Sequence, residues 1–152
     1  MKSAIFATIG RVTSDDLRDD LSFLLARANA LSLAAGNAAL AEHGLRVRSY
    51  SVLALAASSA RPSQRELAEF LRLDPSQVVA LVDDLQLRGL VVREPDPRDR
   101  RANVVVATAE GRELHAAAAE SARSAEHRLH DDLTPIERDQ LGDLLRRLAF
   151  PV

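Results

Sequence analysis

Arginines and aspartates alternate in one short segment, and their chemistry suits contact with a negatively charged polymer. The segment contains Asp96, Arg98, Asp99, Arg100 and Arg101, together with Pro95 and Pro97. Proline restricts the backbone, and a carboxylate orients a neighbouring guanidinium group through charge-assisted hydrogen bonds. An arginine held in this way on a thin hairpin suits the narrow minor groove of DNA, where the negative potential is strongest. A solvated polar turn is the simpler alternative.

The helix expected after Asp74 offers a second such surface. Its core face carries Val78, Leu81, Val82 and Leu85, and its opposite face carries Ser76, Val79, Ala80 and Asp83, with Gln77 beside its start. Short side chains let a helix enter the major groove. There Gln77 can pair with an adenine edge, Ser76 can donate or accept, and Val79 can contact a thymine methyl group. An ordinary exposed helix face is the alternative.

Histidines provide a third kind of chemistry. His127 and His130 lie three residues apart on one predicted helix, and His115 lies several turns earlier. Two imidazoles at this spacing can bind a divalent cation. No obvious third ligand shares their face of the helix, so we expect no metal site, and no cofactor is indicated.

The elements that position these residues follow from hydrophobic spacing and helix caps. Periodicity predicts helices over about 15–41, 46–58, 63–72, 74–88, 109–130 and from 134 onward, with strands at 91–93 and 103–107. Capping residues mark four helix starts, namely Ser63, Asp74, Thr108 and Thr134. We therefore predict a mainly α-helical protein with a small β-hairpin wing.

The order of the elements predicts two regions within a single domain of residues 1–152. Residues 45–107 form a winged helix-turn-helix DNA-binding lobe, and residues 12–43 and 109–150 form a helical dimerisation region. The outer helices carry apolar stripes that are too long for so small a lobe to cover. A two-fold homodimer buries such stripes most simply, and packing within one chain is the alternative.

Composition excludes several classes of protein. The chain has 152 residues and a net charge of −2, so it is not a uniformly basic nucleic-acid coat. Residues 44–107 nevertheless hold ten basic and eight acidic side chains, while the flanking regions are net acidic. The absence of cysteine excludes disulfides, cysteine zinc sites and thiol redox sensing.

Neither an enzyme nor a membrane protein is expected. No glycine-rich phosphate loop, cysteine nucleophile or serine–histidine–acid set is recognisable. The first ten residues have one lysine and only a short apolar stretch, which is less than a signal peptide needs. No apolar run approaches the roughly 20 residues of a membrane span. We expect a soluble cytoplasmic protein.

Several segments together resemble one known family. They are Gly44-Leu45, Ser49-Tyr50-Ser51-Val52-Leu53, Ser63 through Ala68, Asp74-Pro75-Ser76, Leu81-Val82-Asp83, Arg88-Gly89-Leu90-Val91, Asp96 through Arg101, and Thr108 through Arg112. In this combination the chain resembles the MarR family of transcriptional regulators over nearly its whole length. The wing sequence before a Thr-x-x-Gly helix start is the most specific part of the resemblance.

The resemblance implies a homodimer on a pseudo-palindromic operator in double-stranded DNA. Such proteins usually repress transcription until a small aromatic or phenolic ligand loosens the DNA-competent form. It also implies that Arg101 enters the minor groove with Asp99 steadying it. The full set of expected DNA contacts is Ser63, Gln64, Ser76, Gln77, Val79, Ala80, Arg98, Asp99, Arg100 and Arg101.

In relatives, an effector pocket forms between the first two helices, the fifth helix and the winged lobe. The residues expected there are Phe23, Arg27, His43, Arg46 and Tyr50, which offer aromatic surface, cations for a carboxylate and one imidazole. Tyr50 and Phe23 as core residues, and Arg27 and Arg46 as solvated ones, are the alternative.

Two positions depart from the family pattern. Family members often have a basic residue where Ala80 and Asp84 stand. Their absence motivates a second hypothesis, a winged-helix protein-interaction module without specific DNA binding.

Overall fold

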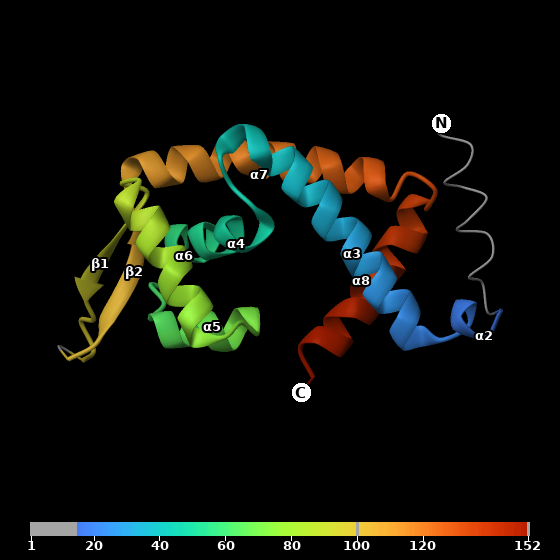
Figure 1. Cartoon of the computed structure of the whole chain (residues 1–152), viewed down its shortest axis with the longest axis horizontal. Coiled ribbons are helices and arrows are strands. Elements are labelled where there is room, and N and C mark those ends of the chain that lie inside the picture. Colours follow the sequence, from blue (N-terminus) through green and yellow to red (C-terminus); the bar gives the residue numbers. More distant parts are fainter. Residues whose placement is uncertain (1–14, 100, 152) are drawn as a thin grey trace. The chain divides into compact units, whose positions relative to one another are not determined.

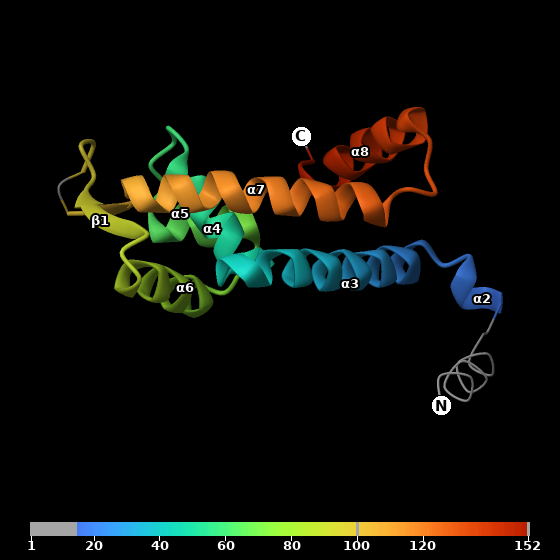
Figure 2. The same cartoon turned by 90° about the horizontal axis from the view of Figure 1, so that it is seen from above.

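The computed structural model describes residues 15–99 and 101–151, and Figures 1 and 2 show its elements from two directions. In chain order these are α2 (Asp15–Arg18), α3 (Leu21–Leu40), the 3-10 helix η1 (Ala41–His43), α4 (Val47–Ala57), α5 (Gln64–Leu71), α6 (Pro75–Leu87), β1 (Val91–Pro95), β2 (Asn103–Ala107), α7 (Ala109–Leu129) and α8 (Pro135–Ala149). The described chain is therefore mainly α-helical with one hairpin, as predicted. It separates into two compact units, with the boundary between Ala34 and Ala35.

The predicted helix over 15–41 was wrong at its beginning. The structure has a single turn, α2, before α3 begins at Leu21. The Asp20 carboxylate accepts the backbone N–H of Phe23 at 2.7 Å and so satisfies an amide that the first turn of α3 leaves free. The leucine spacing continues across this break, which is why periodicity alone did not reveal it.

The expectation that no apolar run approaches the length of a membrane span was also wrong. Residues Leu21–His43 form a continuous helical stretch of 23 residues that is long and apolar enough to cross a membrane by length and composition. Mostly buried core helices of soluble proteins and signal sequences near an N-terminus pass the same test, and 6% of the apolar window is buried in the single chain. Within this stretch Leu21, Leu24 and Leu31 are exposed in the single chain.

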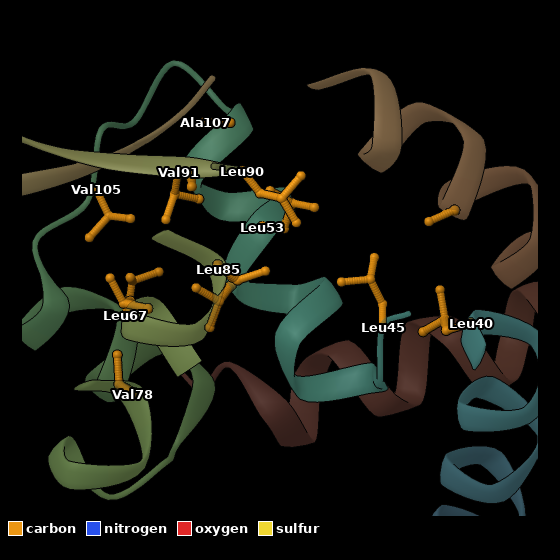
Figure 3. Close-up of a cluster of buried hydrophobic side chains, with 14 of the residues drawn as sticks. Leu40, Leu45, Leu53, Leu67, Val78, Leu85, Leu90, Val91, Val105 and Ala107 are labelled. Carbon is orange, nitrogen blue, oxygen red and sulfur yellow. The ribbon is translucent and has the colours of Figure 1, made fainter. Parts of the chain in front are cut away.

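The core of the second unit lies among α4, α5, α6 and the hairpin. Val78, Val82 and Leu85 of α6 are fully buried, which confirms the predicted core face of that helix. Figure 3 shows Leu53 of α4, Leu67 of α5 and Leu85 of α6 within one cluster of apolar side chains. This cluster fixes α6 relative to the hairpin and leaves the opposite face of α6 outward.

Helix α7 begins at a tight junction with the hairpin and packs against α4. The Thr108 side chain caps α7 by accepting the N–H of Gly111 and also donates to the carbonyl of Gly89 at 2.7 Å. A Cβ atom at Gly111 would lie 2.0 Å from the carbonyl oxygen of Leu90, so only glycine fits there. The junction therefore sets where the wing leaves the helical part of the unit.

The hairpin is an antiparallel pair in which Val91 faces Ala107 and Pro95 faces Asn103. Figure 1 shows it extending away from α7 beside α5 and α6. The N–H of Val105 also donates to the carbonyl of Pro62 at 2.8 Å, just before α5. The start of α5 is thus attached to the wing.

Candidate nucleic-acid interface

The outward face of α6 is built from short, exposed side chains. Ser76, Gln77, Val79 and Ala80 are all exposed. The Asp74 carboxylate caps the helix by accepting the N–H of Ser76 at 2.8 Å and its hydroxyl at 2.5 Å. These bonds, the hydroxyl one foremost, hold the pKa of the Asp74 carboxyl below its usual value. The Ser76 hydroxyl proton is therefore engaged, and its oxygen is left as an acceptor.

The wing carries one arginine in a fixed orientation. The Asp96 side chain, which is only 6% exposed as a residue, accepts the backbone N–H of Arg98 at 2.8 Å. It also pairs with the Arg98 guanidinium at 3.2 and 3.1 Å. This pairing lowers the pKa of the Asp96 carboxyl and raises that of the Arg98 guanidinium. The expected ordering of arginines by carboxylates thus occurs at Asp96 and Arg98.

Arg101 is held through its backbone instead. Its N–H donates to the Asp99 carboxylate at 2.9 Å. The Arg101 side chain is exposed and has no hydrogen bond or ion pair with the residues that the structure describes. Asp99 therefore shapes the turn and leaves the Arg101 guanidinium available. Arg100 lies outside the described residues.

The start of α5 faces the same wing. Ser63 and Glu66 form a reciprocal capping box, in which each side chain binds the other's backbone N–H. The Glu66 carboxylate accepts both the backbone N–H and the hydroxyl of Ser63, and these two bonds lower the pKa of the Glu66 carboxyl, the backbone N–H contributing most. A Glu66 oxygen also lies 3.9 Å from the Arg98 guanidinium. Ser63 and Gln64 are half-buried, so α5 presents them at its first turn beside the hairpin.

Two arginines near α6 were missed by the sequence analysis. Arg93 of β1 contacts Gln64, Asp83 and Gln86 through its guanidinium group. Arg88 pairs with Asp84 at 3.5 Å and donates to the carbonyl of Gly44 at 2.9 Å.

Both exposed aspartates of α6 therefore lie in ion pairs. The only sequence signal for Arg88 was its i, i+4 spacing from Asp84, and Arg93 had none, because its partners lie in other elements.

The expected effector residues are divided between the two compact units. Phe23 and Arg27 belong to the first compact unit, and His43, Arg46 and Tyr50 belong to the second. Within the second unit the Tyr50 ring stacks on that of His115, with centroids 5.4 Å apart. Tyr50 is thus attached to α7.

His43 also joins η1 to α7. Its Nε2 lies 2.9 Å from the hydroxyl oxygen of Ser121, whose proton goes to Glu42. Nε2 must therefore be the protonated nitrogen. Arg46 lies apart from these contacts and lines a groove of about 420 Å³ together with Asn37, Ala38, Ala41, Gly44 and Leu45.

A second groove of about 410 Å³ lies between α7 and α8 and contains the two histidines considered for metal binding. Arg138 donates to Nδ1 of His127, which occupies the lone pair that a metal would need on that nitrogen. Among residues 15–99 and 101–151, no three or more acidic or histidine side chains are grouped to hold an ion.

Sequence comparisons place these features among transcriptional regulators. A sequence model described as MarR family matches residues 43–102. A curated relative from Thauera aromatica, a putative transcriptional regulatory protein for the hcr operon, is 31% identical over 99 residues. That alignment covers 65% of this chain and 60% of the relative, so the chain spans less than two thirds of that protein.

Solved structures are similar over more of the chain. A transcriptional regulator (MarR family) from Rhodococcus sp. RHA1 has a TM-score of 0.82 and 45% identity, covering 89% of this chain and 97% of that one. CouR from Rhodococcus jostii RHA1, bound to p-coumaroyl-CoA, has a TM-score of 0.82 and 46% identity, covering 90% and 96%. A transcriptional repressor named CouR, bound to a 23-mer DNA duplex, has a TM-score of 0.83 and 30% identity, covering 91% and 98%.

Proposed function

The chain belongs to the MarR family of transcriptional regulators, and we propose that it is a cytoplasmic, homodimeric repressor. We propose further that it leaves its operator when a phenolic acid or its coenzyme A thioester binds. The observation that carries the proposal is the exposed small-residue face of α6 beside a wing whose Arg98 is held by Asp96. This combination fits a helix in the major groove and an arginine in the adjacent minor groove. The structural neighbour bound to a DNA duplex supports it.

The apolar surface of the outer helices supports homodimerisation. On α8, Leu141, Leu144, Leu145 and Leu148 are between 39% and 62% exposed in the single chain. Exposed leucine stripes of this kind mark protein interfaces. A two-fold partner that covers them would also place two winged lobes on one duplex, with half-sites about 10 bp apart.

The class of effector is proposed from a neighbour at 46% identity that binds p-coumaroyl-CoA. Within the second unit, Arg46 is an exposed cation for a carboxylate or phosphate group, and the half-buried Tyr50 offers aromatic surface. His43 and Tyr50 contact α7, so a ligand that moves either of them acts on the helix that begins at the wing. Such a ligand shifts the population away from the DNA-competent form.

Fluorescence anisotropy with a labelled duplex from the DNA upstream of the coding sequence tests the proposal. We expect tighter binding to this duplex than to a shuffled one, and release by p-coumaroyl-CoA. Coenzyme A alone is the matched control and should leave the complex intact. If p-coumaroyl-CoA causes no release while p-coumarate does, the free acid is the effector.

The alternative is a winged-helix interaction module without specific DNA binding. The lack of a basic side chain at Ala80 and Asp84 favours it. Equal affinity for the upstream and shuffled duplexes at low salt would support this alternative and contradict the repressor.

A further inference from the structure

We infer that Arg93 sets the hydrogen-bonding character of the surface that faces DNA. By binding the amide oxygens of Gln64 and Gln86 and the carboxylate of Asp83, it fixes which way both amides point and pairs the charge of the aspartate. The inference rests on the proposed DNA binding and names a residue that determines which groups of the duplex this surface accepts.

The contacts of Arg93 join three elements through one side chain. Its Nε lies 2.7 Å from Oε1 of Gln64 on α5, and its Nη1 lies 2.6 Å from Oε1 of Gln86 on α6. Its Nη2 lies 2.5 Å from Oδ1 of Asp83, also on α6. The Arg93 side chain is only 25% exposed, whereas that of Asp83 is 59% exposed. The guanidinium therefore lies behind the surface that its partners present.

The orientation of both amides follows from chemistry. A guanidinium group has five N–H donors and no acceptor, so the atom of Gln64 or Gln86 that faces it must be the oxygen. This removes the usual ambiguity between the oxygen and nitrogen of a side-chain amide. The NH₂ group of each glutamine is left free for a ligand, whereas one lone pair of each amide oxygen is already used by Arg93.

A glutamine whose oxygen is engaged by Arg93 recognises other groups than a free one, because its NH₂ group is the part most available to a ligand. An NH₂ group suits phosphate oxygens and the acceptors of guanine, whereas bidentate pairing with adenine needs both amide atoms. Gln77 has no side-chain hydrogen bond to the residues that the structure describes and keeps both atoms available. Gln64 and Gln86 therefore suit hydrogen-bond acceptors on the duplex, such as phosphate oxygens. Of the three glutamines, Gln77 is the one that suits adenine.

Asp83 needs Arg93 for a second reason. It lies on the same exposed face as Ala80, where an unpaired carboxylate would repel the phosphates of a docked duplex. Lysine at position 93 would keep the charge, but its single ammonium group lacks the planar fork that reaches three acceptors.

A double-mutant cycle on binding to the upstream duplex tests the inference at one fixed salt concentration. Arg93→Gln should weaken binding about tenfold, because it frees both amides and exposes the Asp83 charge. Asp83→Asn alone should change affinity by less than about twofold, since the charge is already neutralised. In the Arg93→Gln background the same Asp83→Asn change should recover a several-fold part of the loss.

Two controls separate this role from a general loss of charge or fold. Arg123→Gln removes an arginine that pairs with Glu120 on α7, outside the lobe, and should leave affinity unchanged. Arg93→Lys keeps the positive charge and should still weaken binding, with a thermal midpoint close to that of the native chain.

Unchanged binding in Arg93→Gln, or purely additive effects in the cycle, would overturn the inference while the repressor stands. No binding by the native chain would overturn both.

Discussion

Asp96 and Arg98 are joined both through the backbone and through their side chains. One carboxylate accepts the N–H of Arg98 at 2.8 Å and pairs with its guanidinium at 3.1 Å. The turn and the direction of the arginine are thus set by the same group. A wing built in this way presents a cation whose position is fixed before DNA arrives, which lowers the entropy lost on binding.

Asp96→Asn is expected to separate these two effects. The amide oxygen still accepts the backbone N–H, but the charge that orients the guanidinium is lost. We expect weaker binding to the upstream duplex, by about tenfold on the scale of one charge-assisted hydrogen bond. The thermal midpoint should fall somewhat, because the pKa of Asp96 is lowered and its charged form therefore stabilises the fold. Anisotropy and circular dichroism measure the two quantities. Affinity equal to that of the native chain would mean that the orientation of Arg98 does not matter.

Acid should destabilise the protein through its helix caps. Hydrogen bonds from Ser63 and Thr134 hold the pKa values of Glu66 and Glu137 below the ordinary 4.5, and Asp74 is shifted below 3.8 in the same way. Each group therefore contributes stability that is fully present above its ordinary pKa and is lost as pH falls through the lower folded value. Denaturant midpoints should be flat from pH 7 to about 5 and then fall.

Glu137→Gln provides the matched comparison, because the amide keeps acceptor capacity but does not titrate in this range. The variant should show a shallower fall in acid than the native chain. A curve of the same steepness would show that the cap at Thr134 contributes nothing to the acid transition.

Arg101→Ala should weaken binding to the upstream duplex about 10- to 100-fold, since hydrogen bonds to charged groups contribute roughly 1.5–3 kcal/mol. The slope of the logarithm of the affinity against the logarithm of the salt concentration should become shallower by about one, because one cation fewer contacts the DNA. Titrations at several salt concentrations measure both. An unchanged affinity at physiological salt would remove the wing from the mechanism.

Gln77→Ala should reduce discrimination more than general affinity. A bidentate contact with adenine contributes about 1–3 kcal/mol of preference for the correct base. The loss should therefore appear on the upstream duplex and be nearly absent on a shuffled duplex. Equal losses on both would show that Gln77 does not read sequence.

Local signals in the sequence predicted most of the second unit. Capping residues such as Ser63 and Thr134 act within one turn, and the burial of Val78 and Val82 follows from a helical period, so neither depends on distant parts of the chain. The break at Asp20 was missed because the leucine period continues through it. Periodicity records which face is apolar and not where the backbone leaves the helix.

The site was less predictable than the fold. Arg93 and Gln64 are 29 residues apart, and their contact exists only because β1 is placed beside α5 and α6. The same holds for Tyr50 on His115. Residue types indicated a DNA-binding surface, but the partners that orient its side chains come from tertiary structure. The contacts of the chosen residues with DNA remain a prediction.

The number of chains bound to one duplex decides between a dimeric repressor and a protein that does not act as a dimer on DNA. Analytical ultracentrifugation of the full chain with a 23-bp upstream duplex, a length used in the DNA-bound neighbour, gives the mass of the assembly. We expect a dimer of the free protein and two chains on one duplex. A protein that stays monomeric both alone and on the duplex, or that does not associate with the DNA at all, would contradict this expectation.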